Sequence, residues 1–286
     1  MKHTIVYVTY PSEQTWGSDF TFNALLKNSK NNIISWEKKQ TLDHDSIIHF
    51  HNIQIIRKMS YRPIKFIQKL QRDGHIVIGG LRGRMSVKKD EKLLKTVDGI
   101  ACGSDPFLLS YSKQINEFVE CLPAGVDSSL FRKLNVPKTS YLSWIGRSHK
   151  KFKNFNIIQN LGFSFSYATY ENYVPHHLIP EFLCHSFVHV VTSNHEGFCR
   201  PIVEAALCEL PVVSTDVGVA KEILDPEFIV SVPPNPEDYR NILDNLTPDQ
   251  MKQAGKNNKK RAEKYSWKNI VPIYDTFWDY IWSELN

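Results

Sequence analysis

The segment "SNHEGFCRPIVEAALCELPVVSTDVG", residues 193–218, predicts a loop and a helix that directly follow a buried strand. Valines at positions 188, 190 and 191 favour a short buried strand before it, and Gly197 permits a turn. Pro201 suits the first position of a helix. In an open α/β sheet the loop after a strand lies at the carboxyl edge, where ligands bind. The segment therefore predicts an α/β fold with a binding site on this loop.

Two glutamates eight positions apart give this loop its chemistry. Glu196 lies in the predicted loop and Glu204 in the predicted helix. An ionised carboxylate accepts two hydrogen bonds at once, so the paired hydroxyls of a sugar or a ribose are its natural targets. The alternative is a solvated Glu196 and a Glu204 that only stabilises its helix.

A second segment, "GRSHKKFKNF" at residues 146–155, places two cations after another predicted strand. Gly146 ends that strand, and Arg147 and Lys153 follow six residues apart. Two such cations at a carboxyl edge suit a diphosphate, although two surface cations are the alternative for this segment taken alone.

The rest of the chain repeats the alternation of apolar β-branched runs and helical patterns, which predicts parallel sheets. The predicted strands are residues 5–8, 33–34, 47–50, 76–78, 99–101, 141–145, 163–165, 188–191 and 211–214, and helices are expected near 18–27, 61–72 and 88–96. The pattern divides the chain into an N-terminal domain of residues 1–136 and a C-terminal domain of residues 137–264. A last helix over residues 265–286 is expected to pack back toward the N-terminal domain.

Composition sets the broad class. With 286 residues, of which 42% are hydrophobic, the chain is long enough for two separate cores. No stretch approaches the roughly 20 apolar residues that span a bilayer, and the N-terminus leads into a strand, so we expect a cytoplasmic protein without an integral membrane segment. Its five cysteines contain no Cys-x-x-Cys pair, so neither a disulfide framework nor a metal site is expected.

Charge is unevenly distributed. The net charge of the whole chain is +5, but residues 1–136 carry +7 and the remainder −2. Residues 54–95 alone carry +9. This stretch predicts either two lysine-rich solvated helix faces or a surface for an anionic partner, with Arg57, Lys65, Lys69 and Arg84 as the candidate contacts.

These motifs together resemble the retaining glycosyltransferases of family four over nearly the whole chain. "EGFCRPIVEA" at 196–205 is similar to the family's E-x7-E motif, and "LPAGVDSSLF" at 122–131 to its interdomain segment. "GRSHKKFKNF" is similar to its Gly-Arg...Lys segment, and "YSWKNI" at 265–270 to the start of its last helix. The resemblance implies the GT-B fold, in which two Rossmann-like parallel-sheet domains face a central cleft.

The resemblance also implies an activity and a set of site residues. The enzyme would move a sugar from a UDP- or GDP-linked donor to an acceptor hydroxyl, without a metal or another cofactor. Arg147 and Lys153 would bind the donor diphosphate, Glu204 the ribose and Glu196 the transferred sugar. The remaining donor contacts implied are the backbone near Phe198 and Cys199, and Gly17, whose loop would approach the phosphates.

This chain departs from the family's pattern in the first domain. Many relatives have a His-Gly pair after the fourth strand, but "GGLRG" at 79–83 places Arg82 there. Retaining members are thought to pass the acceptor proton to the departing phosphate, so a cation suits this point. His49 and His51 alternate along a predicted strand and point to opposite faces. We choose His51 as the catalytic candidate, with a structural histidine as the alternative.

The acceptor is the least specified substrate. The basic first domain suits an envelope glycan or an anionic lipid, which would make the protein peripheral to a membrane. One alternative is DNA with hydroxymethylated bases, gripped through its phosphates while the target base is flipped out. Another is a catalytically silent sensor that keeps the sugar-nucleotide pocket.

Overall fold

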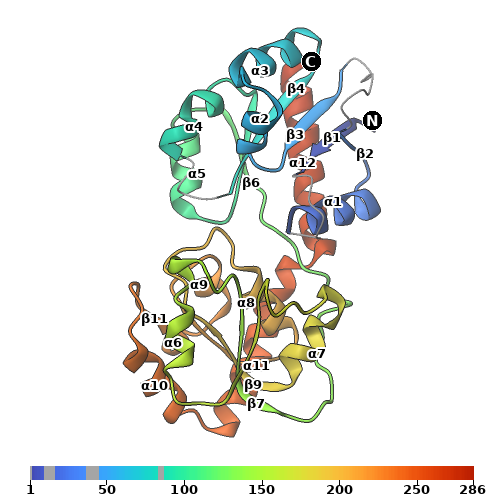
Figure 1. Cartoon of the computed structure of the whole chain (residues 1–286). Coiled ribbons are helices and arrows are strands. Elements are labelled where there is room, and N and C mark those ends of the chain that lie inside the picture. Colours follow the sequence, from blue (N-terminus) through green and yellow to red (C-terminus); the bar gives the residue numbers. More distant parts are fainter. Residues whose placement is uncertain (1, 10–16, 37–44, 83–86) are drawn as a thin grey trace. The chain divides into compact units, whose positions relative to one another are not determined.

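The computed structural model describes residues 2–9, 17–36, 45–82 and 87–286, which form two compact units (Figure 1). The first unit consists of Met1–Gly125 together with Trp267–Asn286, and the second unit of Val126–Ser266. The sequence-predicted Arg84 lies outside the described residues.

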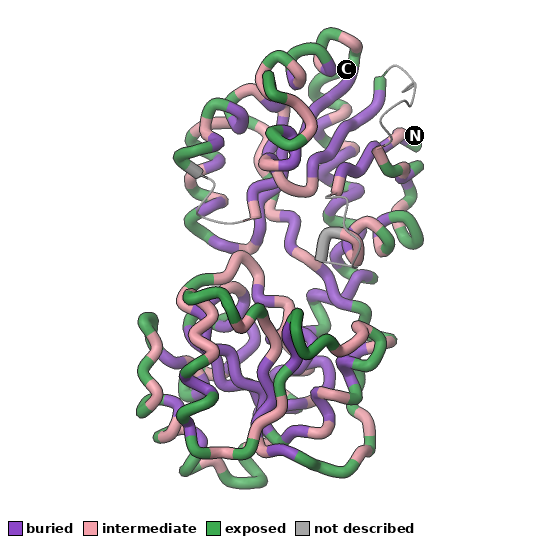
Figure 2. Tube along the Cα trace, viewed as in Figure 1, coloured by how far each residue is buried: buried purple, intermediate pink, exposed green. Residues whose placement is uncertain are grey.

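The first unit is built on a parallel sheet whose described strands have the order β2-β1-β3-β4-β5-β6. Its strands are β1 (Thr4–Val8), β2 (Asn32–Ser35), β3 (Ile47–Phe50), β4 (Ile76–Leu81), β5 (Gly99–Cys102) and β6 (Phe118–Cys121). In the register, Ile5 lies opposite Ile47, and Ile47 opposite Ile76. Every residue of the two central strands β3 and β4 is buried (Figure 2), as expected for parallel strands covered on both faces.

The helices of the first unit cover this sheet. They are α1 (Gly17–Asn28), α2 (Gln54–Met59), α3 (Pro63–Arg72), α4 (Val87–Leu94), α5 (Pro106–Lys113) and α12 (Trp267–Leu285). Pro63 opens α3 and Pro106 opens α5, where the missing N–H of proline costs nothing. Asp105 caps α5 by accepting a hydrogen bond from the Phe107 backbone N–H at 3.0 Å.

The last helix of the chain, α12, is an integral part of the first unit (Figure 1). Trp278 is fully buried, and its indole N–H donates to Nδ1 of His49 in β3 at 3.1 Å. Asp275, which is 6% exposed, accepts from Ser29 Oγ, from the Lys30 backbone N–H at 3.1 Å and from Asn31 Nδ2 at 3.0 Å. One carboxylate on α12 therefore fixes the connection between α1 and β2.

The second unit repeats the design with a parallel sheet of order β11-β10-β9-β7-β8. Its strands are β7 (Ser140–Ile145), β8 (Phe165–Ala168), β9 (Ser186–Val191), β10 (Val212–Thr215) and β11 (Ile229–Val230). Its helices are α6 (Phe155–Gln159), α7 (Ile179–Cys184), α8 (Arg200–Leu207), α9 (Ala220–Ile223), α10 (Pro236–Asp244) and α11 (Pro248–Ala262). Thr247 and Gln250 form a capping box at the start of α11.

The fold agrees with the sequence-based prediction of two parallel-sheet α/β units. Each predicted strand overlaps an observed one, although the strand expected at 163–165 is found at Phe165–Ala168. The sequence reasoning missed β6 and β11. The first is a half-exposed edge strand and the second has two residues, so neither shows the long apolar run of a buried strand.

Among the described residues, no helix combines the length and the apolar character that crossing a bilayer requires.

The carboxylate of Asp275 provides a test of how α12 is attached. We expect Asp275→Ala to lower the free energy of unfolding by about 2–4 kcal/mol, because it leaves buried donors without their charged acceptor. Asp279, one turn later and 35% exposed, pairs with Lys30, so Asp279→Ala should cost less than about 1 kcal/mol. Thermal and urea unfolding would measure both variants, and equal losses would contradict the attachment described.

Candidate active site

Three loops at the carboxyl edge of the second unit's sheet are hydrogen-bonded to one another. They follow the neighbouring strands β7, β9 and β10. Asn154 Nδ2 donates to the Thr192 carbonyl at 2.8 Å and to Asn194 Oδ1 at 2.7 Å, which joins the first two loops. The Val219 backbone N–H donates to the Phe198 carbonyl at 3.1 Å, which joins the third. Side chains on these loops are therefore held in fixed relation.

Lys153 and Glu196 form an ion pair across the first two loops. Their side chains are 15% and 16% exposed. Ser193 Oγ donates a second hydrogen bond to the same carboxylate oxygen at 2.8 Å. Burial is the strongest single influence and acts to lower the pKa of Lys153. The charge of Glu196, its hydrogen bond and a contribution from Cys199 together raise the pKa, so the ammonium keeps its charge.

Arg147 adds a second cation beside this pair. Arg147 lies just after β7 and is exposed. Its positive charge acts to lower the pKa of Lys153, which places the two cations near each other. The two cations that the sequence placed six residues apart are therefore near each other in the folded unit.

The start of α8 faces the same loops. Cys199 precedes the helix with a φ of 63°, a left-handed conformation that is rare for residues with a side chain. Burial and the neighbouring Glu196 raise the pKa of the Cys199 thiol, so it stays protonated. Gly218 lies so close to the Phe198 carbonyl oxygen that a Cβ would approach it to 2.2 Å. This contact fixes the backbone at the N-terminal end of α8, where N–H groups lack helical partners.

Glu204 lies further along α8 and is 4% exposed. His176, from a short 3₁₀ helix (His176–Leu178) before α7, brings Nε2 to 3.6 Å from Glu204 Oε1. In the described part of the chain, His176 is the only basic side chain paired with this carboxylate. A buried carboxylate with so few partners can accept hydrogen bonds from a ligand.

The second unit thus contains most of the predicted donor-site residues together, namely Arg147, Lys153, Glu196, Phe198, Cys199 and Glu204. Sequence reasoning missed Ser193 and His176. Ser193 carried a signal, because it is a polar residue just after a buried strand. His176 carried none, because the fold alone brings it to Glu204.

The predicted residues of the first unit lie at the carboxyl ends of its central strands. His51 follows β3, and its Nδ1 shares a 2.8 Å hydrogen bond with the hydroxyl of Tyr7 in β1. Arg82 follows β4 and donates to the His51 carbonyl at 3.1 Å, to the Leu122 carbonyl at 2.5 Å and to the Tyr274 hydroxyl at 3.4 Å. Gly17 is the first residue of α1. Arg82 therefore joins the ends of β3 and β6 to α12.

The two histidines of this region differ in environment as their alternation predicts. His49 is fully buried, and burial followed by the charge of Arg82 holds its pKa well below the usual value. His51 is only partly buried. His49 is therefore a neutral core residue, and His51 is the one that keeps contact with solvent.

The basic stretch of the first unit is partly neutralised. Arg57 donates through Nε to the fully buried Asp90 at 2.6 Å, and Lys69 pairs with Asp73 at 2.5 Å. Lys65 is exposed on α3. Part of the +9 charge thus serves the fold, while Lys65 faces solvent.

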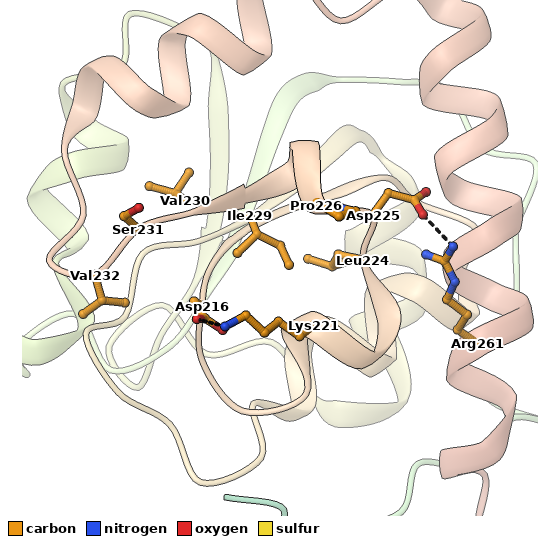
Figure 3. A pocket seen from close by; sticks show the side chains of 10 residues that line it. All are labelled: Asp216, Lys221, Leu224, Asp225, Pro226, Ile229, Val230, Ser231, Val232 and Arg261. Carbon is orange, nitrogen blue, oxygen red and sulfur yellow. Dashed lines mark hydrogen bonds and ion pairs between the residues drawn. The ribbon is translucent and has the colours of Figure 1, made fainter. Parts of the chain in front are cut away.

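A pocket of about 860 Å³ lies elsewhere in the second unit, beside the edge strand β11 (Figure 3). Figure 3 shows Lys221 reaching Asp216, and Arg261 reaching Asp225, on two sides of an apolar floor that includes Ile229. None of the predicted site residues lines this pocket. We therefore take the three loops, with their converging charges, as the candidate site.

The described residues contain no group of three or more His, Cys, Asp or Glu side chains arranged to hold a metal ion.

Comparison with known proteins gives a family match within the second unit. Residues 145–264 match the family described as "Glycosyl transferases group 1". This match lies within the second unit and covers less than half of the chain. A phosphatidylinositol N-acetylglucosaminyltransferase component from Arabidopsis thaliana is 30% identical over 113 residues, which cover 37% of this chain. An uncharacterized glycosyltransferase of Methanocaldococcus jannaschii is 28% identical over 130 residues, which cover 44%. The matches span only 24% and 36% of those two proteins.

Solved structures extend the likeness to the whole chain. The Anabaena protein HepE, in complex with UDP and glucose, has a TM-score of 0.72 at 11% identity and covers 99% of this chain and 100% of its own. The sucrose-phosphate synthase of Thermosynechococcus elongatus has a TM-score of 0.67 at 14% identity, with coverage of 83% and 74%. The predicted GT-B fold, with its two Rossmann-like parallel-sheet domains, is confirmed, whereas glycosyltransferase activity stays a prediction. Assignment to family four and the central cleft stay predictions.

A double-mutant cycle would test the partly buried ion pair between Lys153 and Glu196 in the second unit. We expect Lys153→Met and Glu196→Gln each to lower the free energy of unfolding by about 3 kcal/mol, because each leaves the other group buried without its partner. The double variant should lose less than the sum by about 1–3 kcal/mol. Urea unfolding would give the coupling, and strictly additive losses would contradict the pair.

Proposed function

We propose that this chain is a retaining, metal-independent glycosyltransferase that moves a sugar from a UDP- or GDP-linked donor to an acceptor hydroxyl. The observation that carries the proposal is the grouping at one sheet edge of two cations, the partly buried Glu196 and helix α8, which contains the buried Glu204. UDP is the first donor nucleotide to test, because HepE is described in complex with UDP and with UDP-glucose.

The cations and the helix start suit the diphosphate. Arg147 and Lys153 supply positive charge, and the N-terminal amides of α8 supply hydrogen-bond donors. Departure of the nucleoside diphosphate leaves new negative charge on its phosphate, and groups already in place stabilise it without reorganisation. This arrangement supports a reaction without a metal cofactor.

The carboxylates suit the two sugars of the donor. Glu204 accepts hydrogen bonds from the ribose hydroxyls, and Glu196 from hydroxyls of the transferred sugar. Glu196 is held by Lys153 and Ser193, so its oxygens are already oriented before the donor arrives. In a retaining reaction the acceptor proton passes to the departing phosphate on the same face of the sugar.

Three residues of the first unit complete the proposal. His51 is the partly exposed histidine, and its ring is oriented by Tyr7, so it can contact the acceptor. Arg82 contributes positive charge at the carboxyl edge while it holds the strand ends together. Gly17, the first residue of α1, is the third and is proposed as a donor contact.

Donor binding gives the direct test of this site. We expect Arg147→Ala to weaken UDP binding about tenfold, and Glu204→Ala to weaken it about 10- to 100-fold, because each removes a charge-assisted contact. Titration calorimetry would measure the affinities, with Lys151→Ala, an exposed lysine two residues before Lys153, as the matched control. Unchanged affinity in both site variants would refute the assignment. Binding without donor hydrolysis or transfer would favour the silent sensor instead.

For the acceptor we propose an envelope glycan or a lipid presented to the basic first unit, in a cytoplasmic enzyme peripheral to a membrane. The positive charge that supports this also favours a second candidate, DNA with hydroxymethylated bases. Lys65 is exposed on α3, and its neighbours Arg62 and Tyr61 are exposed as well, with the Arg62 guanidinium 5.3 Å from the Tyr61 ring centroid.

Salt dependence separates the two acceptors. If Lys65 contacts a phosphate, log affinity for a duplex with hydroxymethylcytosine should fall with log salt, and Lys65→Ala should reduce that slope by about 0.9. Lys256→Ala, an exposed lysine on α11, is the control that should leave the slope unchanged. No duplex binding at low salt would exclude DNA, whereas sugar transfer to that duplex would place DNA ahead of the envelope acceptors.

A further inference from the structure

Glu204 and His176 form an unusual pair in the second unit. Glu204 is 4% exposed, and a carboxylate taken out of water needs hydrogen-bond donors or cations nearby. No Lys or Arg in the described part of the chain pairs with it. The thiols of Cys199 and Cys208 lie close enough for the charge of Glu204 to help raise their pKa values. His176 is thus the one basic group that the described fold brings to this carboxylate.

A contact with Phe131 also restrains the position of His176. Its ring lies edge-on against Phe131, with the centroids 5.3 Å apart and the planes at 61°. Phe131 is itself buried, at 1% exposed. The side chain of His176 is 27% exposed, and its Nε2 lies 3.6 Å from Glu204 Oε1. The imidazole is therefore held between a rigid aromatic ring and the carboxylate, at the border of the core.

We propose that His176 is a positioning residue that orients the Glu204 carboxylate to recognise the vicinal hydroxyls of a ribonucleotide. This inference rests on the proposed function, in which Glu204 binds the donor ribose. His176 Nε2 lies 3.6 Å from Glu204 Oε1, beyond hydrogen-bond length, and its proximity limits rotation of the carboxylate. Both oxygens then present lone pairs to the 2′- and 3′-hydroxyls, and the donor must be a ribonucleotide rather than a deoxyribonucleotide.

The measurable consequence is a dependence on the 2′-hydroxyl that needs His176. In the unmodified protein, replacing UDP by 2′-deoxy-UDP should weaken binding tenfold or more, roughly the effect of one hydrogen bond to a charged group. In His176→Ala the carboxylate is no longer oriented, and the ratio of the two affinities should fall to about twofold. A purely structural role would lower both affinities equally and leave the ratio unchanged.

The experiment is a ligand and residue cycle measured by titration calorimetry on the full chain. UDP and 2′-deoxy-UDP are titrated into the unmodified protein, His176→Ala, His176→Gln and His177→Ala. His177 is the exposed neighbour in the same 3₁₀ helix and should keep the full ratio. His176→Gln retains a hydrogen-bond donor and should recover part of the ratio between the UDP and 2′-deoxy-UDP affinities. Circular dichroism and thermal unfolding establish that each variant is folded. If His176→Ala does not fold, His176→Gln is used for the test in its place.

The outcomes separate this inference from the proposed function. A ratio that collapses in His176→Ala and persists in His177→Ala supports the positioning role. A ratio that stays at its full value in His176→Ala overturns the positioning role. If this variant still binds UDP, the proposed donor site itself is not contradicted. Equal binding of UDP and 2′-deoxy-UDP by the unmodified protein overturns the ribose role of Glu204 and the inference with it. If neither UDP nor GDP binds, the proposed function itself fails.

Discussion

The candidate site depends on two opposite charges held largely out of water at one sheet edge. Lys153 and Glu196 come from different loops, and neither would be stable there alone, because an unpaired buried charge is costly. The pair forms only if the loops after β7 and β9 stay together. The hydrogen bonds of Asn154 to Thr192 and Asn194 hold the same two loops together. The pair therefore keeps the cation and the carboxylate preorganised for a charged ligand. Removing the two charges from water costs free energy, which the folding of the whole unit offsets.

Backbone strain near α8 shows a second constraint. Cys199 and Glu209 both have positive φ values, of 63° and 58°, at the two ends of this helix. Glycine adopts such angles without steric cost, whereas for other residues they cost about 1 kcal/mol or more. Glu209 gains partial compensation from ion pairs with Lys133 and Lys259, and α11 approaches its carbonyl so closely that only Gly255 fits. The ends of α8 are thus held by packing, which keeps Glu204 in place between them.

Sequence reasoning succeeded where a function is carried by local pattern. The strand, turn and helix around Glu196 and Glu204 are encoded by adjacent residues, and so is the spacing of Arg147 and Lys153. It failed where the partner comes from a distant segment. Nothing near His176 indicates Glu204, and nothing near Ser29 indicates Asp275, 246 residues later. Such pairs follow from the tertiary fold, which single-sequence periodicity does not contain.

Arg82 shows how a structural role and a chemical one combine in the same side chain. Its three described hydrogen bonds go to two carbonyls and a hydroxyl, and in the described part of the chain it forms no ion pair with a carboxylate. Neutral acceptors fix a guanidinium in space but do not cancel its charge. Its charge also helps keep His49 neutral. A fixed positive charge therefore persists at the carboxyl edge of the first sheet, and it favours an anionic ligand or a developing negative charge there.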